Sequence, residues 1–169
     1  MGDGACDRDT LAQLVARAHR RLVRRAAVDR ELADWLREPG SSSVDGISVD
    51  HTRGPAEAYR AEFVQRLLPG SVPLPYRRLP DRPWVAVLCA PQDRTRAGLP
   101  AGWARAVVLL HARVAGADAS YLYQPVEEAG VRIKLQDQLR LPGAAHLVLR
   151  LGVGSGTPPP GRRTASEVT

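Results

Sequence analysis

Residues 101–123 read AGWARAVVLLHARVAGADASYLY, and the pattern within them changes from helix to strand. The nearly continuous apolar run predicts a helix over Ala101–Ala115 that belongs at the centre of a domain. Gly116 follows at the position where a left-handed residue commonly ends a helix. A short strand is then predicted over Ser120–Tyr123, so this one stretch already indicates a fold that contains both helix and sheet.

Two further apolar runs, Trp84–Ala90 and His146–Leu151, predict strands on either side of this stretch. Between them, Pro125 begins a second helix that is expected to end before Pro142. Its apolar face carries Val131, Leu135 and Leu139. The predicted fold class is therefore α+β, with a mixed sheet of three strands packed on the apolar helix and flanked by the other helices.

The N-terminal part reads as two helices. Thr10 and Gln13 fit a capping box at the start of the first helix. Apolar residues recur behind it at helical spacing, namely Leu11, Leu14, Val15, Ala18, Leu22 and Ala26. Arginines occupy mostly the opposite side, namely Arg17, Arg20, Arg21, Arg24 and Arg25. This basic face is expected to be solvated or to contact a partner, and a second short helix is predicted over Asp29–Leu36.

Three regions follow from these patterns. Residues 1–40 hold the N-terminal helices, and residues 84–169 form an α/β lobe with a tail rich in proline, glycine and arginine. Residues 41–83 are predicted to be a loop, lid or arm, with one short helix over Ala56–Leu68 and a proline-rich stretch over Gly70–Pro83.

Composition excludes several classes of protein. The 169 residues are 44% hydrophobic and 25% charged, which is typical of a globular chain and not of a disordered one. No apolar run approaches the ~20 residues that a membrane span needs, so a cytoplasmic protein without membrane contact is expected. The net charge of +6 is the difference between 24 basic and 18 acidic residues, and Lys134 is the only lysine among the basic ones. Because few aromatic residues lie among the arginines, nucleic acid is not the expected partner.

No self-contained catalytic site is evident. The two cysteines, Cys6 and Cys89, and the four histidines lack metal-ligand spacing, so no metal is expected. His111 is expected to be a hydrogen-bonded core residue, and Glu127 and Glu128 to be helix-start charges that favour the helix dipole. The tryptophans are expected to be core or interface anchors, namely Trp35, Trp84 and Trp103.

The order of the last motifs is more informative than any one of them. The tetrapeptide Gln124-Pro125-Val126-Glu127 follows a strand, the next strand ends in Leu149-Arg150-Leu151-Gly152, and Arg162-Arg163 follow a proline run. In this order the chain resembles the nitroreductase family of FMN-dependent enzymes. It looks closest to the C-terminal half of the actinobacterial, Acg-like branch of that family.

The resemblance implies an FMN-dependent oxidoreductase that takes electrons from NAD(P)H and reduces nitro- or quinone-like small molecules. By the same resemblance, Arg162 and Arg163 bind the FMN phosphate. Residues Gln124, Pro125, Val126 and Glu127 lie along the isoalloxazine ring. The flavin would carry the chemistry, so no catalytic side chain is assigned.

The departures from the family leave alternatives open. Gly161 and His146 stand where that branch has proline and glutamine. The branch's N-terminal phosphate-binding arginine cluster and its Ser-x-x-x-Asn-x-Gln-Pro-Trp segment have no counterpart in this sequence. The chain is therefore expected to be a half-size lobe whose partner is another copy or a second nitroreductase-like subunit. A truncated, non-catalytic chain that serves as a partner subunit or sequesters flavin remains an alternative, and so does a solvated tail at Arg162-Arg163.

Overall fold

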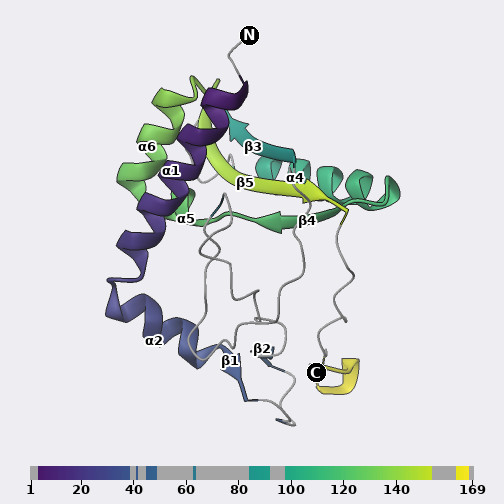
Figure 1. Ribbon diagram of the computed structural model, residues 1–169. Helices are drawn as coiled ribbons and strands as arrows, with labels where there is room; N and C mark the ends of the chain where they lie inside the picture. Colours follow the sequence, from purple (N-terminus) through teal and green to yellow (C-terminus); the bar gives the residue numbers. More distant parts are fainter. Residues whose placement is uncertain are drawn as a thin grey trace.

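A three-stranded antiparallel sheet lies at the centre of the computed structural model, which describes residues 4–38, 41, 45–48, 63, 84–91, 98–153 and 163–167. The strands are β3(Trp84–Ala90), β4(Asp118–Tyr121) and β5(Ala144–Gly152), in the order β3-β5-β4 (Figure 1). The α+β class is confirmed. The expectation of a mixed sheet is wrong for these strands, because β5 runs antiparallel to both neighbours.

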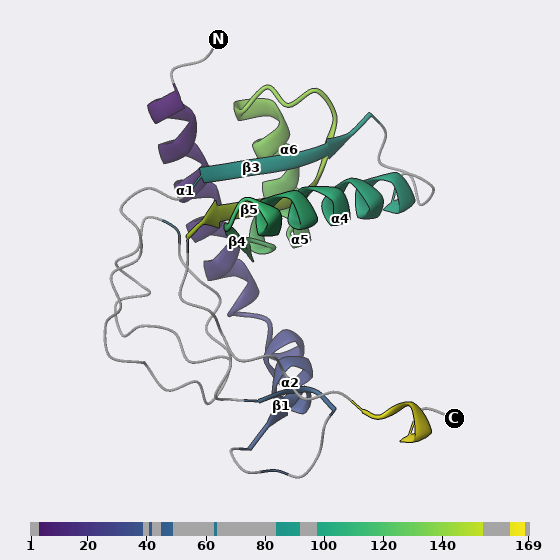
Figure 2. The ribbon, with the colours of Figure 1, turned by 90° about the vertical axis from the view of Figure 1, so that its right-hand side faces the viewer.

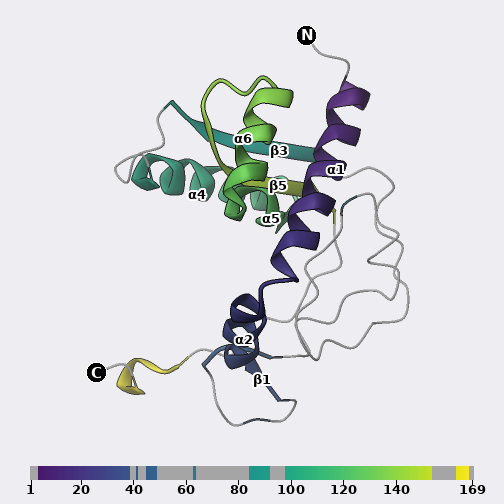
Figure 3. The same ribbon diagram turned by 90° about the vertical axis from the view of Figure 1, so that its left-hand side faces the viewer.

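One face of the sheet is covered by α1(Gly4–Leu22), α5(Gln124–Glu127) and α6(Ala129–Gln138), with α1 and α6 foremost in Figure 3. Their apolar sides meet the strands in a single core, which includes Leu11, Leu14, Val15, Ala18, Leu122, Val131, Leu135, Ala145 and Val148. The predicted apolar face of the first helix is thus confirmed from Leu11 to Leu22, whereas Ala26 is exposed. The N-terminal helix α1 and the C-terminal α/β lobe therefore share one hydrophobic core.

The first helix begins earlier than its predicted cap. α1 starts at Gly4, so Thr10 lies inside the helix and the capping-box prediction is wrong. Asp7 falls in the first turn, where its negative charge favours the helix dipole. Extending a helix that already exists costs much less than nucleating one, so the added turn needs no cap at Thr10.

The other face of the sheet is covered by α4(Gly98–Val114), which contacts all three strands and lies in front of them in Figure 2. Side chains alternate along a strand, so Leu147 and Leu149 of β5 point to this face, opposite to Val148. Both leucines are buried. Gly116 follows the helix with a φ of 74°, which confirms the predicted left-handed C-terminus.

The central position expected for this helix is wrong. No residue of α4 is buried, although it is the most apolar helix of the chain. A narrow sheet can cover only one side of a helix, and α4 is apolar on more than one side. The rest of its apolar surface faces away from the sheet.

A second group of elements lies at the opposite end of the molecule from the sheet (Figures 1–3). It comprises α2(Ala26–Asp34), the parallel two-residue strands β1(Leu36–Arg37) and β2(Ile47–Ser48), and the 3₁₀ turn η2(Ala165–Glu167). The predicted second helix is confirmed with earlier bounds. The predicted helix Ala56–Leu68 and the arm Gly70–Pro83 lie outside the described residues, apart from the buried Phe63.

The turn into β5 depends on Gly143. A Cβ atom at this position would lie 2.2 Å from the carbonyl oxygen of Ala90, at the end of β3. The obstacle is backbone, which cannot rotate away as a side chain can. At Gly102, inside α4, an added Cβ would meet nothing within 4 Å.

These two glycines should therefore respond in opposite ways to the same substitution. We expect Gly143→Ala to lower the free energy of unfolding by about 2–3 kcal/mol, because the end of β3 must move away from the new methyl group. Gly102→Ala should raise it by about 0.5–1 kcal/mol, since alanine favours an exposed helix interior. Urea unfolding followed by circular dichroism measures both changes. Equal stability of the two variants would contradict the tight turn.

Candidate functional site

The predicted ring-binding segment Gln124–Glu127 forms the one-turn helix α5, two residues after the edge strand β4. Pro125 occupies the first turn, where its missing N–H costs no hydrogen bond. The side chains of Gln124 and Pro125 are buried against the core, Val126 is half-buried and Glu127 is exposed. In this segment the outward-facing groups are therefore the Glu127 side chain and part of Val126.

α5 and α6 are separate helices. Glu128 between them has an extended backbone, with φ −95° and ψ 102°. The prediction of one continuous helix beginning at Pro125 is therefore wrong. Val131 and Leu135 are nevertheless buried on one face, as predicted, and Leu139 packs against the core.

The break at Glu128 turns its carboxylate toward α1. Oε1 accepts a hydrogen bond from Nη1 of Arg21 at 3.1 Å, and Oε2 accepts one from Nη2 of Arg25 at 2.5 Å. The Glu128 side chain is only 10% exposed, whereas the two arginines are about half exposed. Both carboxylate oxygens thus have a charged donor, which a buried carboxylate requires. The pairs join the end of α1 and the start of α2 to the residue that follows the candidate segment.

The sequence pattern did not predict the ion pairs of Glu128. Glu127 and Glu128 were expected to act alike as helix-start charges, yet one is exposed and the other is buried in an ion-pair cluster. Arg21 lies in the last turn of α1, whereas Arg25 lies beyond that helix and directly precedes α2, so helical spacing does not bring them to one acceptor. Which carboxylate they reach depends on how α1 packs, and spacing alone does not give that.

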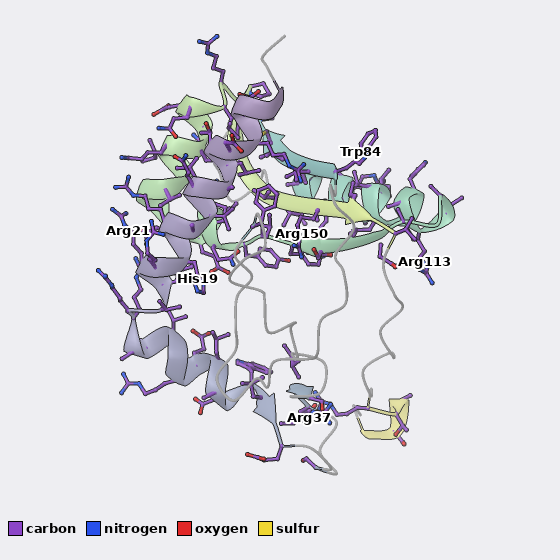
Figure 4. The ribbon with its side chains drawn as sticks, in the orientation of Figure 1. His19, Arg21, Arg37, Trp84, Arg113 and Arg150 are labelled. Atoms are coloured by element: carbon purple, nitrogen blue, oxygen red, sulfur yellow. The ribbon has the colours of Figure 1, made fainter. Side chains whose placement is uncertain are left out.

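Next to the segment, β4 and β5 bring together Ser120 and Arg150. The Arg150 Nε donates to the Ser120 Oγ at 2.8 Å, across the β4–β5 register (Figure 4). Burial lowers the pKa of the Arg150 guanidinium. The rings of Tyr121 and Tyr123 stack with centroids 5.1 Å apart, and Tyr123 directly precedes α5. A polar pair and a partly exposed aromatic pair thus flank the candidate segment.

The predicted phosphate-binding tail lies elsewhere. The Arg163 Nε is 2.9 Å from the Asp45 Oδ1, and both side chains are at least half exposed. Arg162 lies outside the described residues. The turn η2, which follows Arg163 in the chain, lies at the same end of the molecule as β1 and β2, whereas α5 lies at the sheet (Figures 1–3). The described structure does not bring Arg163 to the segment Gln124–Glu127.

The remaining candidate groups do not form a second site. Within the described ranges, no group of three His, Cys, Asp or Glu residues could hold a metal ion. Burial raises the pKa of the Cys89 thiol, which makes it a poor nucleophile at neutral pH. His111 is exposed, with its Nδ1 2.9 Å from the carbonyl oxygen of Val107, so its predicted core position is wrong. None of the described helices is long and apolar enough to cross a membrane.

Comparison with known proteins adds no family assignment. No protein-family profile matches the chain, and no curated protein is significantly similar to it. The nitroreductase resemblance therefore rests on the order of motifs in this sequence.

The ion pairs of Glu128 with Arg21 and Arg25 should contribute measurably to stability. Glu128→Gln should lower the free energy of unfolding by about 1–2 kcal/mol, because the amide cannot accept charged hydrogen bonds at both of its terminal atoms. The matched control is Asp118→Asn, which removes the exposed Arg113–Asp118 pair of 2.9 Å and should cost at most about 0.5 kcal/mol. Urea midpoints of both variants test this ranking, and a larger loss in the control would contradict it.

Proposed function

We propose that the chain is a cytoplasmic, FMN-binding oxidoreductase of nitroreductase type. It uses NAD(P)H to reduce nitro- or quinone-like small molecules, and it completes its flavin site only together with a second chain. The order of the three motifs supports this proposal, from Gln124–Glu127 through Leu149–Gly152 to Arg162-Arg163. The observation that carries it is the position of Gln124–Glu127, which follows the edge strand and is tied to α1 through Glu128.

The chemistry of these residues suits the two ends of FMN. In this segment the N–H groups of Val126 and Glu127 already donate to the carbonyl oxygen of Tyr123, so the exposed Glu127 side chain is the group that faces a planar ring. Exposed ion pairs contribute little free energy, so a phosphate that accepts several hydrogen bonds from arginine can compete with Asp45 for Arg163. When bound, the flavin supplies the hydride transfer, and the chain's own residues orient it.

A second candidate function is a non-catalytic one. It is favoured by the pairing of Arg163 with Asp45 at a distance from α5. In this alternative the chain is a nitroreductase-like partner subunit or a module that sequesters flavin.

Flavin binding can be measured directly by titrating FMN with protein and following FMN fluorescence. We expect quenching that saturates. In the double variant Arg162→Ala/Arg163→Ala, the affinity should fall by about 10- to 100-fold, the usual loss for charged hydrogen bonds to phosphate. The matched control Arg113→Ala removes an exposed arginine of α4 and should bind FMN like the parent chain.

The two candidate functions separate in a turnover assay. Oxidation of NADH or NADPH by a nitro or quinone acceptor, with FMN present, supports the oxidoreductase. Flavin binding without turnover supports the sequestering module instead. Unchanged FMN fluorescence at the highest attainable protein concentration would overturn both flavin-dependent functions.

A further inference from the structure

Helix α4 has two apolar sides, and the sheet covers only one of them. Ala101, Ala104, Val108 and Ala112 are half-buried and recur at the spacing of one helix face. On the opposite side, the large apolar residues follow each other at intervals of four, four, three and four. These five large residues and the small Ala106 form what we call the α4 stripe: Leu99, Trp103, Ala106, Val107, Leu110 and Val114.

The α4 stripe is open along the whole helix. Its large side chains have exposed fractions of 82% for Leu99, 77% for Trp103, 39% for Val107, 68% for Leu110 and 90% for Val114. Together they leave a contiguous and mostly apolar surface uncovered along the helix. A contiguous apolar surface of this kind on a folded chain indicates an interaction site.

Charge does not oppose the approach of a like surface. No member of the α4 stripe is charged, and the helical spacing places Arg105 on the other side of the helix. Arg113 borders the stripe, but its Nη1 lies 2.9 Å from the Asp118 Oδ1, so its charge is locally balanced (Figure 4 labels Arg113). Two copies of this surface can therefore meet without strong electrostatic repulsion.

The spacing of the α4 stripe is symmetric about the midpoint between Ala106 and Val107. In an antiparallel pair of α4 helices centred there, Trp103 faces Leu110 of the partner subunit, and Leu99 faces Val114 of the partner subunit. Ala106 faces Val107 of the partner subunit, and this small residue at the centre permits close approach of the two helix axes. Such self-matching is what a two-fold interface requires, because both copies present the same patch.

We propose that a second copy of this chain covers the α4 stripe, in a two-fold dimer whose α4 helices pack antiparallel. The choice of a second copy rests on the proposed function, which calls for another chain, and the inference adds the surface and its register. Trp103, which the sequence predicts to be either a core or an interface anchor, is then an interface anchor.

The oligomeric state tests the proposal without flavin. Sedimentation velocity of the purified chain should show a dimer, and Trp103→Glu or Leu110→Glu should each shift it to a monomer. Arg105→Glu places the same new charge on α4 away from the stripe and should remain dimeric. Circular dichroism confirms that each variant keeps its helices. A parent chain that stays monomeric at all attainable concentrations would overturn the proposal and point to a different protein as the occupant.

The register has its own test, in a background of Cys6→Ser and Cys89→Ala. Ala106→Cys lies next to the two-fold axis and should form a disulfide-linked dimer on mild oxidation. Leu99→Cys should not, because the two copies of position 99 are about 22 Å apart along antiparallel helices. Cross-linking at both positions would contradict the antiparallel arrangement. Since neither experiment measures FMN, the dimer and the flavin site can fail separately.

Discussion

Burial of β5 on both faces is the constraint on which the rest of the structure depends. The strand lies between β3 and β4, and Val148 points to one side while Leu147 and Leu149 point to the other. Both sides need an apolar cover, because a three-stranded sheet cannot bury its own faces. The chain places α1 and α6 on one face and α4 on the other.

The two covers are not equivalent. α1 is amphipathic, so its apolar side enters the core while Arg21 on its other side reaches the Glu128 carboxylate. α4 carries apolar residues around most of its circumference, and the narrow sheet leaves many of them exposed. The candidate segment Gln124–Glu127 lies on the side of the amphipathic cover, where ion pairs hold its end in place. The outer side of α4 stays exposed and apolar.

Much of the fold could be predicted from the residues. The apolar run Trp84–Ala90 became β3 with the same bounds, and Gly116 ends α4 in the left-handed conformation. Local patterns determine such features, because backbone hydrogen bonding and side-chain period act over a few residues. The single helix predicted from Pro125 was wrong, since the helix breaks at Glu128, whose carboxylate meets two distant residues, Arg21 of α1 and Arg25 at the start of α2.

For the candidate site, the sequence by itself determined which residues could matter and in what order, from Gln124–Glu127 to Arg163. Only the tertiary structure decided that Gln124 is buried, that Glu127 is exposed, and that Arg163 pairs with Asp45 away from α5. It also decided that Trp103 and Leu110 face outward on the most apolar helix. The physical reason is that composition states how apolar a helix is, whereas burial depends on how much surface its neighbours can cover.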